Sequence, residues 1–418
     1  NHYQDSRKTR AYRKSTQRRI ALCYYGIFPL NLIVRVIFEQ NQLLKIAVIG
    51  AGVSGLSVAS LLAKAGHEVS VFEKNQRIRE VGAGIQISPN GFCVLKEIGL
   101  SKKVIQTSIC NKSILICDYQ NGQKLLQFDQ SSVLGKENFR LLHRADLINL
   151  LYRSAVSNKV SFNLGYTADA KSLRDQYSFV IGADGVHSTT RSLLNPQQSK
   201  NRRSDYFAWR SIVPNKFNHH SGVRLTIAPN KHIVSYPVRG SDQLNLVLIQ
   251  ESENDEIFEW SRKEKPENIK NLFSEFGGDL GDALKSVETV HKWGLSSQDI
   301  PSNWAIDNIF LIGDALHPML PFLAQGANSA LEDAFILAKL ITFHEPSKAA
   351  EKYIEIRKPR LLRLMKAIKN NAWKFHLEHS LFRIGAHSGL SLLDKTFPQS
   401  ANLPFRWLYN YDVTNLNI

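Results

Sequence analysis

The sequence predicts an α/β protein in which a Rossmann-like nucleotide-binding domain is joined to an antiparallel sheet and followed by C-terminal helices. Three observations support this prediction. A Gly-x-Gly-x-x-Gly turn follows an apolar run near residue 50, and turns that contain Gly and Asp recur near residues 184 and 314. Between the last two turns, residues 201–290 contain runs that alternate with the period of two that is typical of antiparallel strands.

The first turn predicts a site for a dinucleotide. Residues 46–49 form an apolar strand, and the turn GAGVSG leads into a helix that ends near residue 64. The second strand, residues 68–72, ends at an acid placed to accept hydrogen bonds from a ribose, which favours FAD or NAD over NADP. The residues that we assign to the nucleotide here are Gly50, Gly52, Val53, Ser54, Gly55, Glu73 and Lys74.

The other two turns decide between FAD and NAD. Asp184 follows the strand of residues 177–182, and Asp314 follows the strand of residues 308–312. Open α/β sheets bind ligands at the carboxyl ends of their strands, so both acids are candidates for ligand contact. Three distant parts of the chain then meet at one sheet edge. This is odd for an NAD dehydrogenase and expected of a protein that threads FAD across one large domain.

From about Lys45 to its C-terminus, the chain resembles the class A, single-component flavin-dependent aromatic hydroxylases of the salicylate hydroxylase and para-hydroxybenzoate hydroxylase type. The motifs that carry the resemblance are GAGVSG, REVGAGIQISPNG, LLHRADL, GADGVHSTTR, GDALHPMLPFLAQGAN and the tail FRWLYNYDV. The resemblance implies a GR2-type flavoprotein fold with FAD as cofactor, and NADH or NADPH and O2 as co-substrates.

The resemblance also implies roles for individual residues. Asp314, after Gly313, would bind the ribityl chain, while Arg144 would lie along the phosphate and ribityl region and Arg79 near the ribose or the reductant. Asp184 belongs to a motif that contacts both FAD and NAD(P)H. A helix that opens near residue 326 would direct N–H groups at the flavin, where its dipole stabilises the reduced form. The remaining residues assigned to the flavin are Ala83, Gly84, Gln86, Gly326, Ala327 and Asn328.

The substrate side is less sharply defined, and three residues are the catalytic candidates. Arg210 would bind a substrate carboxylate or position the flavin, unless it is an exposed strand arginine. Tyr236 would face the substrate, unless it is an ordinary sheet tyrosine, and Pro321 matches a loop proline whose carbonyl approaches the substrate hydroxyl. His317 is expected to be structural, and no metal-binding cluster appears.

The expected reaction is hydroxylation of a hydroxybenzoate such as salicylate through a flavin C4a-hydroperoxide. Two alternatives stay open: hydroxylation of a quinone precursor or heterocycle, and a lipid-acting epoxidase or reductase on the same fold. The basic, amphipathic residues 352–376 would suit the lipid reading as a membrane-binding helix, although a packed helix with a solvated basic face explains them better. A regulatory binding module is disfavoured because every flavin motif is intact.

Composition adds expectations about partners and location. The formal net charge is +16, but residues 1–45 hold nine Lys/Arg and two Asp/Glu, which leaves +9 for the rest of the chain. The four cysteines show no paired spacing, which suits a reducing cytoplasm. We expect a cytoplasmic protein with a small aromatic substrate, no nucleic-acid partner and no membrane association, and we leave a homodimer open.

The chain is expected to contain an N-terminal extension, a divided FAD-binding domain, a substrate-binding sheet and a helical tail. Residues 1–42 form the extension, basic and then apolar, which we interpret as translated upstream sequence rather than a membrane anchor. Residues 43–200 and 291–345 form the two parts of the FAD-binding domain, residues 201–290 the substrate-binding sheet, and residues 346–418 the C-terminal helical region.

Overall fold

The computed structural model describes residues 43–78, 83–129, 138–198, 205–216, 219–252, 262–295, 298–375, 385, 388 and 405–418. Residues 44–418 belong to one compact unit. The predicted N-terminal extension and Arg79 both lie outside the described residues. No helix in this described part of the chain is long and apolar enough to cross a membrane.

The first of the two large sheets has six strands in the order β16-β17-β9-β1-β2-β8. Strand β1 (Lys45–Ile49) lies in parallel between β2 (Glu68–Glu73) and β9 (Phe179–Gly182), and β9 pairs in parallel with β17 (Ile309–Leu311). The edge strands are β8 (Ser161–Leu164) and the antiparallel β16 (Ala305–Ile306). Because β1, β9 and β17 run in the same direction, their carboxyl ends bring the three predicted turns to one sheet edge.

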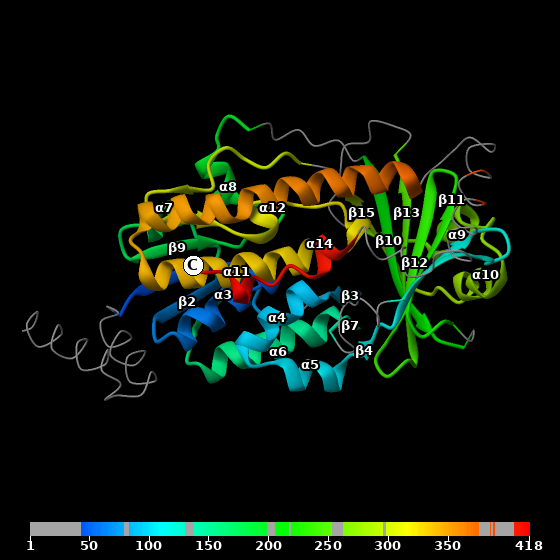
Figure 1. The fold of residues 1–418 in the computed structure, drawn as a ribbon, viewed down its shortest axis with the longest axis horizontal. Helices are drawn as coiled ribbons and strands as arrows, with labels where there is room; N and C mark the ends of the chain where they lie inside the picture. Colours follow the sequence, from blue (N-terminus) through cyan, green and yellow to red (C-terminus); the bar gives the residue numbers. More distant parts are fainter. Residues whose placement is uncertain are drawn as a thin grey trace, which may run out of the picture. The chain divides into compact units, whose positions relative to one another are not determined.

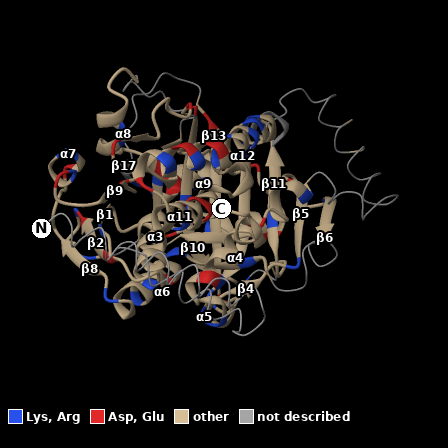
Figure 2. Cartoon of the chain, turned by 60° about the vertical axis from the view of Figure 1, so that its left-hand side comes forward, with Lys and Arg blue, Asp and Glu red and all other residues tan. Residues whose placement is uncertain are grey.

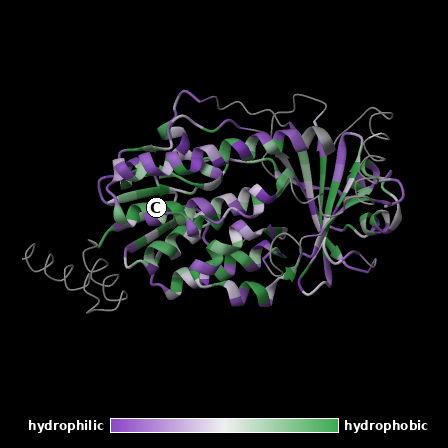
Figure 3. Cartoon of the chain, in the orientation of Figure 1, coloured by the Kyte–Doolittle hydropathy of each residue, from purple (hydrophilic) through white to green (hydrophobic). Residues whose placement is uncertain are grey.

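Helices cover this sheet because parallel strands must be buried on both faces. The helices α3 (Val53–Lys64) and α11 (Gly326–Phe343) follow the first and third turns and pack against each other (Figure 1). Helices α4 (Pro89–Ile98), α5 (Ser101–Thr107), α6 (Arg144–Ser157), α7 (Ala170–Leu173) and α8 (Thr189–Leu194) complete this part. Figure 3 shows that the central strands are largely hydrophobic, as their burial requires.

The second large sheet has eight strands in the order β14-β15-β10-β13-β12-β11-β5-β6. The strands from the predicted substrate region are β10 (Tyr206–Pro214), β11 (Val223–Ala228), β12 (Lys231–Val238), β13 (Gln243–Glu251), β14 (Arg262–Glu264) and β15 (Val290–Leu295). Residues 113–129 add β5 (Ser113–Asp118) and β6 (Lys124–Asp129), with β5 parallel to β11. The predicted domain boundaries stay a prediction, and the sheet reaches beyond residues 201–290.

The two faces of the eight-stranded sheet differ in chemistry. One face packs Trp209, Leu246 and Leu248 against α9 (Pro266–Leu272) and α10 (Gly278–Lys285). Because side chains alternate along a strand, the neighbouring positions Arg210, Tyr236 and Asn245 share the opposite face. That face meets the short sheet of β3 (Gly84–Ile87), β7 (Arg140–His143) and β4 (Ile109–Cys110) through a hydrogen bond from Gly84 to Asn245.

The C-terminal region begins with the long helix α12 (Pro346–Phe375), which contacts α11 and the loop after β17. Lys and Arg recur along α12 (Figure 2). Several of its apolar residues are nevertheless buried, at Tyr353, Leu361, Leu364 and Ile368. The segment at residues 405–418, which includes α14 (Arg406–Tyr409), closes the described chain.

A histidine in the loop before β11 gives the protein a predictable pH dependence. His219 donates from Nδ1 to the His220 carbonyl at 2.6 Å, and its Nε2, 2.7 Å from Ser235, accepts from that hydroxyl. Burial, with a smaller contribution from Arg224, lowers the pKa of His219 to about 4. The unfolded chain therefore binds one more proton than the folded chain between about pH 6.5 and pH 4, and this histidine destabilises the fold as the pH falls through that range.

We expect His219→Gln to reduce the loss of unfolding free energy between pH 7 and pH 4, measured by urea denaturation at a series of pH values. All other histidines remain in both proteins, so the difference between the two curves reports His219. Curves that stay parallel would show that His219 does not titrate in this way.

Candidate flavin and substrate site

The Gly-rich turn after β1 has the geometry of a phosphate cradle. A Cβ on Gly50, whose φ is +104°, would lie 2.4 Å from the Ala183 carbonyl oxygen, and one on Gly55 would lie 2.0 Å from the Gly50 carbonyl oxygen. By contrast, a Cβ on Gly52, the N-cap of α3, would meet nothing within 4 Å. The predicted residues Val53 and Ser54 begin α3 behind this open space. The first N–H groups of a helix bind anions readily, so a pyrophosphate fits here.

Glu73 ends β2 beside this turn. Its Oε2 accepts from the Ala51 N–H at 2.9 Å, and its Oε1 accepts from the backbone N–H and the side-chain amide of Asn75 at 3.0 and 2.7 Å. A carboxylate has about four acceptor positions, so one remains for a ribose hydroxyl. Lys74 follows directly and is exposed.

The strand β3 is held from three sides. The Ala83 carbonyl accepts from the Arg144 N–H at 2.8 Å, and the Gln86 carbonyl accepts from the Asn328 side-chain amide at 3.1 Å. The Gly84 N–H donates to Asn245 at 2.6 Å. A Cβ on Gly84 would lie 2.5 Å from the Tyr236 ring, so a glycine is required where β3 meets the substrate sheet.

The predicted acid of the second turn, Asp184, forms hydrogen bonds within the protein. The Asp184 carboxylate accepts from the Ser188 hydroxyl at 2.5 Å and from the backbone N–H groups of Thr189 and Thr190 at 2.9 and 3.1 Å. These bonds hold the start of α8. A ligand that contacts the Asp184 carboxylate would therefore have to share its oxygens with Ser188, Thr189 and Thr190.

Sequence reasoning missed Arg191, which lies one turn into α8. Its side chain is buried and donates to the carbonyls of Asp314 and Ala315 at 3.1 and 3.0 Å, and also to that of Val186. Arg191 therefore ties the second turn to the third. The only signal in the sequence was its place in the GADGVHSTTR motif, which does not reveal burial.

Asp314 lies at the third turn, just beyond β17. Within the described residues its carboxylate makes no hydrogen bond or ion pair, although it is only half-exposed. Its Oδ1 lies near the N-terminus of α11, 4.0 Å from the position of a Cβ built on Gly326. A partly buried carboxylate without a protein donor fits a ligand that brings hydroxyl groups, as the ribityl chain of FAD does.

The start of α11 carries the other residues predicted for the flavin. Gly326 and Ala327 are half-buried, whereas Asn328 is fully buried. The Asn328 amide donates to the carbonyls of Gln86 and Ala324, and its oxygen accepts from the Ser88 N–H at 3.0 Å. Asn328 thus fixes α11 against β3 and α4, while Gly326 and Ala327 leave the helix N-terminus open to a ligand.

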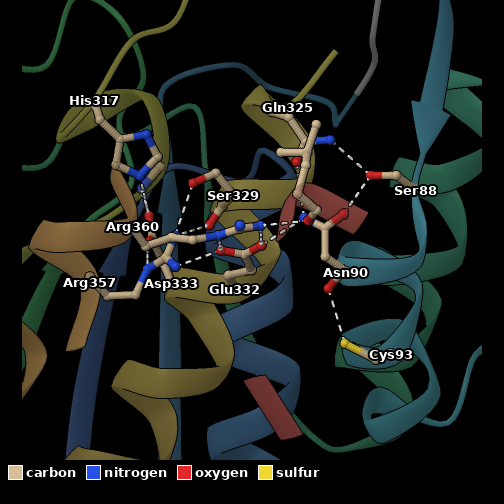
Figure 4. Close-up of polar contacts among 12 residues, drawn as sticks. Ser88, Asn90, Cys93, His317, Gln325, Ser329, Glu332, Asp333, Arg357 and Arg360 are labelled. Atoms are coloured by element: carbon tan, nitrogen blue, oxygen red, sulfur yellow. Dashed lines mark hydrogen bonds and ion pairs between the residues drawn. The ribbon is translucent and has the colours of Figure 1, made fainter. Parts of the chain in front are cut away.

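A cluster of buried ionisable side chains is bonded to the third turn, and Figure 4 shows their polar contacts. The predicted structural residue His317 is fully buried and donates from Nε2 to Asp333 at 2.5 Å. The same carboxylate accepts from the Gly313 N–H at 2.9 Å and from Arg357 at 2.7 Å. Burial alone would raise the pKa of Asp333, but His317, Arg357 and the Gly313 N–H together bring this pKa well below its usual range.

The cluster continues to the C-terminal segment. Arg357 and Arg360 of α12 both donate to Glu332, at 2.5 and 2.9 Å, and Asn90 of α4 donates to the same carboxylate at 2.6 Å. Arg360 also donates to the carbonyls of Trp407 and Leu408, each at 2.9 Å. The five ionisable side chains of His317, Glu332, Asp333, Arg357 and Arg360 therefore connect the turn at Gly313 to the tail, and we call them the buried charge cluster.

The three catalytic candidates lie on or against one face of the substrate sheet. The Arg210 guanidinium stacks 5.3 Å from the Trp293 ring centre, and Tyr236 is 3% exposed. Pro321 begins a short helical turn, and its carbonyl accepts from the Ala324 N–H at 3.0 Å. The next residue, Phe322, packs against Tyr206 and His232 of this face, with ring centres 5.0 and 5.4 Å away.

Comparisons with known proteins agree with this geometry. A family model described as an FAD binding domain matches residues 44–368. A 3-amino-4-hydroxybenzoate 2-monooxygenase of Streptomyces cremeus is 33% identical, over 80% of this chain and 88% of that protein. A 3-hydroxybenzoate 6-hydroxylase of Klebsiella oxytoca is 27% identical, over 80% and 89%. The solved structure of a salicylate hydroxylase substrate complex matches with a TM-score of 0.72 and 20% identity, over 89% and 96%.

The predicted fold class and the predicted resemblance are both confirmed. The family match spans most of the described chain, and the first of these relatives covers four-fifths of it at 33% identity. The residues of the three turns fit the cofactor that the family binds. The chain therefore belongs to the FAD-binding-domain family and is a flavoprotein monooxygenase of the class A aromatic hydroxylase type.

Proposed function

We propose that this enzyme hydroxylates a small aromatic carboxylic acid that already carries a ring hydroxyl or amino group, with NADH or NADPH and O2 as co-substrates. A hydroxybenzoate such as salicylate is the first candidate. The observation that carries the proposal is that Arg210 and Tyr236 share the sheet face that meets β3. Two relatives are named for substituted benzoates, which supports a carboxylate in the substrate.

Arg210 is suited to that carboxylate. A guanidinium presents its N–H donors in a planar fork that matches a carboxylate, and it stays charged at any physiological pH. The Trp293 ring beneath the guanidinium fixes its plane. Arg210 would therefore bind the substrate and orient its ring.

Tyr236 is suited to donate a hydrogen bond. Burial raises the pKa of Tyr236, and the opposing effect of Arg210 is smaller. The hydroxyl therefore keeps its proton at neutral pH and would donate to a substrate oxygen rather than take a proton from it. His317 is also poorly placed as a base, because it is fully buried and bonded to Asp333.

The flavin would be held by Asp314, Glu73, the N-terminus of α3 and the N-terminus of α11. When bound, FAD would accept a hydride from the reductant and would activate O2, so that one oxygen atom can be transferred to the ring. The protein would orient the substrate and exclude water, and Phe322 with Leu320 forms an apolar cluster against the sheet that suits exclusion.

Two alternatives rank lower. A quinone precursor or heterocycle would not need Arg210 as a carboxylate partner. A lipid-acting enzyme would use α12 to bind membranes, but its apolar residues Tyr353, Leu361 and Leu364 are buried against the protein, and Leu362 is its one large hydrophobic side chain among the described residues that is mostly exposed. We also propose a cytoplasmic location, which the free cysteines Cys93, Cys110 and Cys117 suit; a homodimer stays a prediction.

The proposal is tested with the purified full chain and added FAD. Oxidation of NADH and of NADPH is followed at a fixed O2 concentration with salicylate, 3-hydroxybenzoate, 3-amino-4-hydroxybenzoate and unsubstituted benzoate, and the products are identified by mass spectrometry. We expect at least one substituted benzoate to stimulate oxidation and to gain one oxygen atom, with benzoate inactive. If bound flavin is reduced equally fast with and without every acid, the proposal of an aromatic acid substrate fails. A quinone precursor, a heterocycle or a lipid would then be the substrate to test.

A further inference from the structure

Asn245 occupies a central position on the substrate sheet. It lies on β13 opposite Tyr236 of β12, and its side chain is fully buried. It also pairs with Ile212, which places it diagonally across from Arg210 on the same face of the sheet. Diagonal neighbours on a sheet are within reach of a long side chain, so Asn245 and Arg210 can contact one small ligand.

One end of the Asn245 amide is fixed by the backbone. The Gly84 N–H lies 2.6 Å from the side chain and can only donate, so the atom that faces it must be the oxygen, Oδ1. The nitrogen, Nδ2, is the other branch of the amide and diverges from β3. The orientation of the amide group is therefore set by the protein rather than by a ligand.

The Nδ2 donor is buried and has no hydrogen-bond partner within the described residues. A buried amide without an acceptor is costly, and native proteins rarely retain one unless another molecule supplies the acceptor. Arg210 and the Tyr236 hydroxyl, which also offer donors, are its neighbours on this face. Donors that share one sheet face, one of them a buried amide without an acceptor, call for a ligand that is rich in acceptor oxygens.

We propose that Asn245 is a specificity-determining residue, whose Oδ1 holds β3 in place while its Nδ2 donates to the carboxylate of the aromatic substrate together with Arg210. This inference rests on the proposed function. A carbonyl oxygen of the flavin is the other acceptor that could bind Nδ2. A substitution that replaces this donor by an acceptor distinguishes binding to the flavin from binding to the substrate. A carboxylate is favoured because it accepts from both Arg210 and Asn245, whereas a neutral carboxamide would present an N–H₂ group to one of these donors.

The test replaces Asn245 by aspartate, which has the same shape and keeps an oxygen for the Gly84 N–H but turns the free donor into an acceptor. Binding of 3-hydroxybenzoate and of 3-hydroxybenzamide is titrated without reductant, from the change in the flavin absorption spectrum. We expect the wild-type protein to prefer the acid, and Asn245→Asp to lower this preference at least tenfold while its affinity for FAD stays within about threefold.

Other outcomes are decisive as well. An unchanged preference for the acid in Asn245→Asp overturns the inference, and so does lost FAD affinity with an unchanged preference, which would assign Nδ2 to the flavin. Asn245→Leu is the second variant, because a side chain of similar shape removes the Nδ2 donor without adding charge and reports the same ratio if the aspartate variant does not fold. Failure of the wild-type protein to bind any aromatic acid would instead refute the proposed function.

Discussion

Replacing Asp314 by alanine is expected to weaken FAD binding by about ten- to a hundredfold, the equivalent of about 1.5–3 kcal/mol for the loss of a hydrogen bond to a charged group. The reason is that this half-buried carboxylate has no hydrogen-bonding or ionic partner within the described residues and lies at the open N-terminus of α11. Fluorescence quenching of FAD on titration with the flavin-free protein measures the affinity directly.

Asp307 provides a matched control for this experiment. It is another aspartate next to β17, but its side chain is 62% exposed and pairs with Arg174 on the surface. Asp307→Asn should bind FAD as the wild-type protein does. If Asp314→Ala retains full FAD affinity, the carboxylate does not hold the cofactor and its assigned role is wrong.

Replacing Arg357 by methionine should lower the free energy of unfolding by about 3–5 kcal/mol, because removal of one partner leaves buried charges uncompensated. Arg357 is fully buried and bonded to both Asp333 and Glu332, which are themselves fully buried. Methionine has a similar volume, so lost packing contributes little. Urea denaturation followed by circular dichroism measures the change.

Lys285→Met is the control, since Lys285 and its partner Asp282 are 78% and 59% exposed. Exposed pairs of this kind contribute little to stability, so the denaturation midpoint should not move. Equal midpoints for Arg357→Met and the wild-type protein would show that the buried charge cluster does not stabilise the fold.

The parts of the site that the sequence predicted are those with a local signature. A strand, a glycine turn and a helix within about twenty residues define the pyrophosphate cradle, and the acid after β2 follows at a fixed distance. The parallel order of β1, β9 and β17 then places Asp314 beside the first turn. These features depend on short-range backbone geometry, which residue types alone specify.

The buried charge cluster could not be predicted in the same way. Glu332 and Asp333 occur inside a helix. Arg357 and Arg360 occur within a basic stretch whose pattern is typical of a solvated helix face. They are buried because α12 packs against α11 and because the tail at residues 407–408 covers Arg360. Such burial depends on contacts between distant segments, and no local pattern records it.

Asp184 and Asn328 show that a polar residue in a motif can have structural bonds that the sequence does not reveal, and their roles as ligand contacts stay a prediction. The Asp184 carboxylate is bonded to the start of α8, and both ends of the Asn328 amide are bonded to backbone. Asn245 shows the reverse case, since nothing in an alternating strand sequence distinguishes it from a solvent-facing asparagine. Only its register with Tyr236 and its contact with Gly84 reveal its position.

The most direct test of the proposed reaction is the origin of the oxygen in the product. The full chain, loaded with FAD, is incubated with NADH or NADPH and the most stimulatory substituted benzoate under ¹⁸O₂, and the product is analysed by mass spectrometry. A flavoprotein monooxygenase that acts on aromatic acids should place one ¹⁸O atom on the ring. An unlabelled ring, with NAD(P)H consumed and only hydrogen peroxide formed for every acid in the panel, would contradict the proposed reaction.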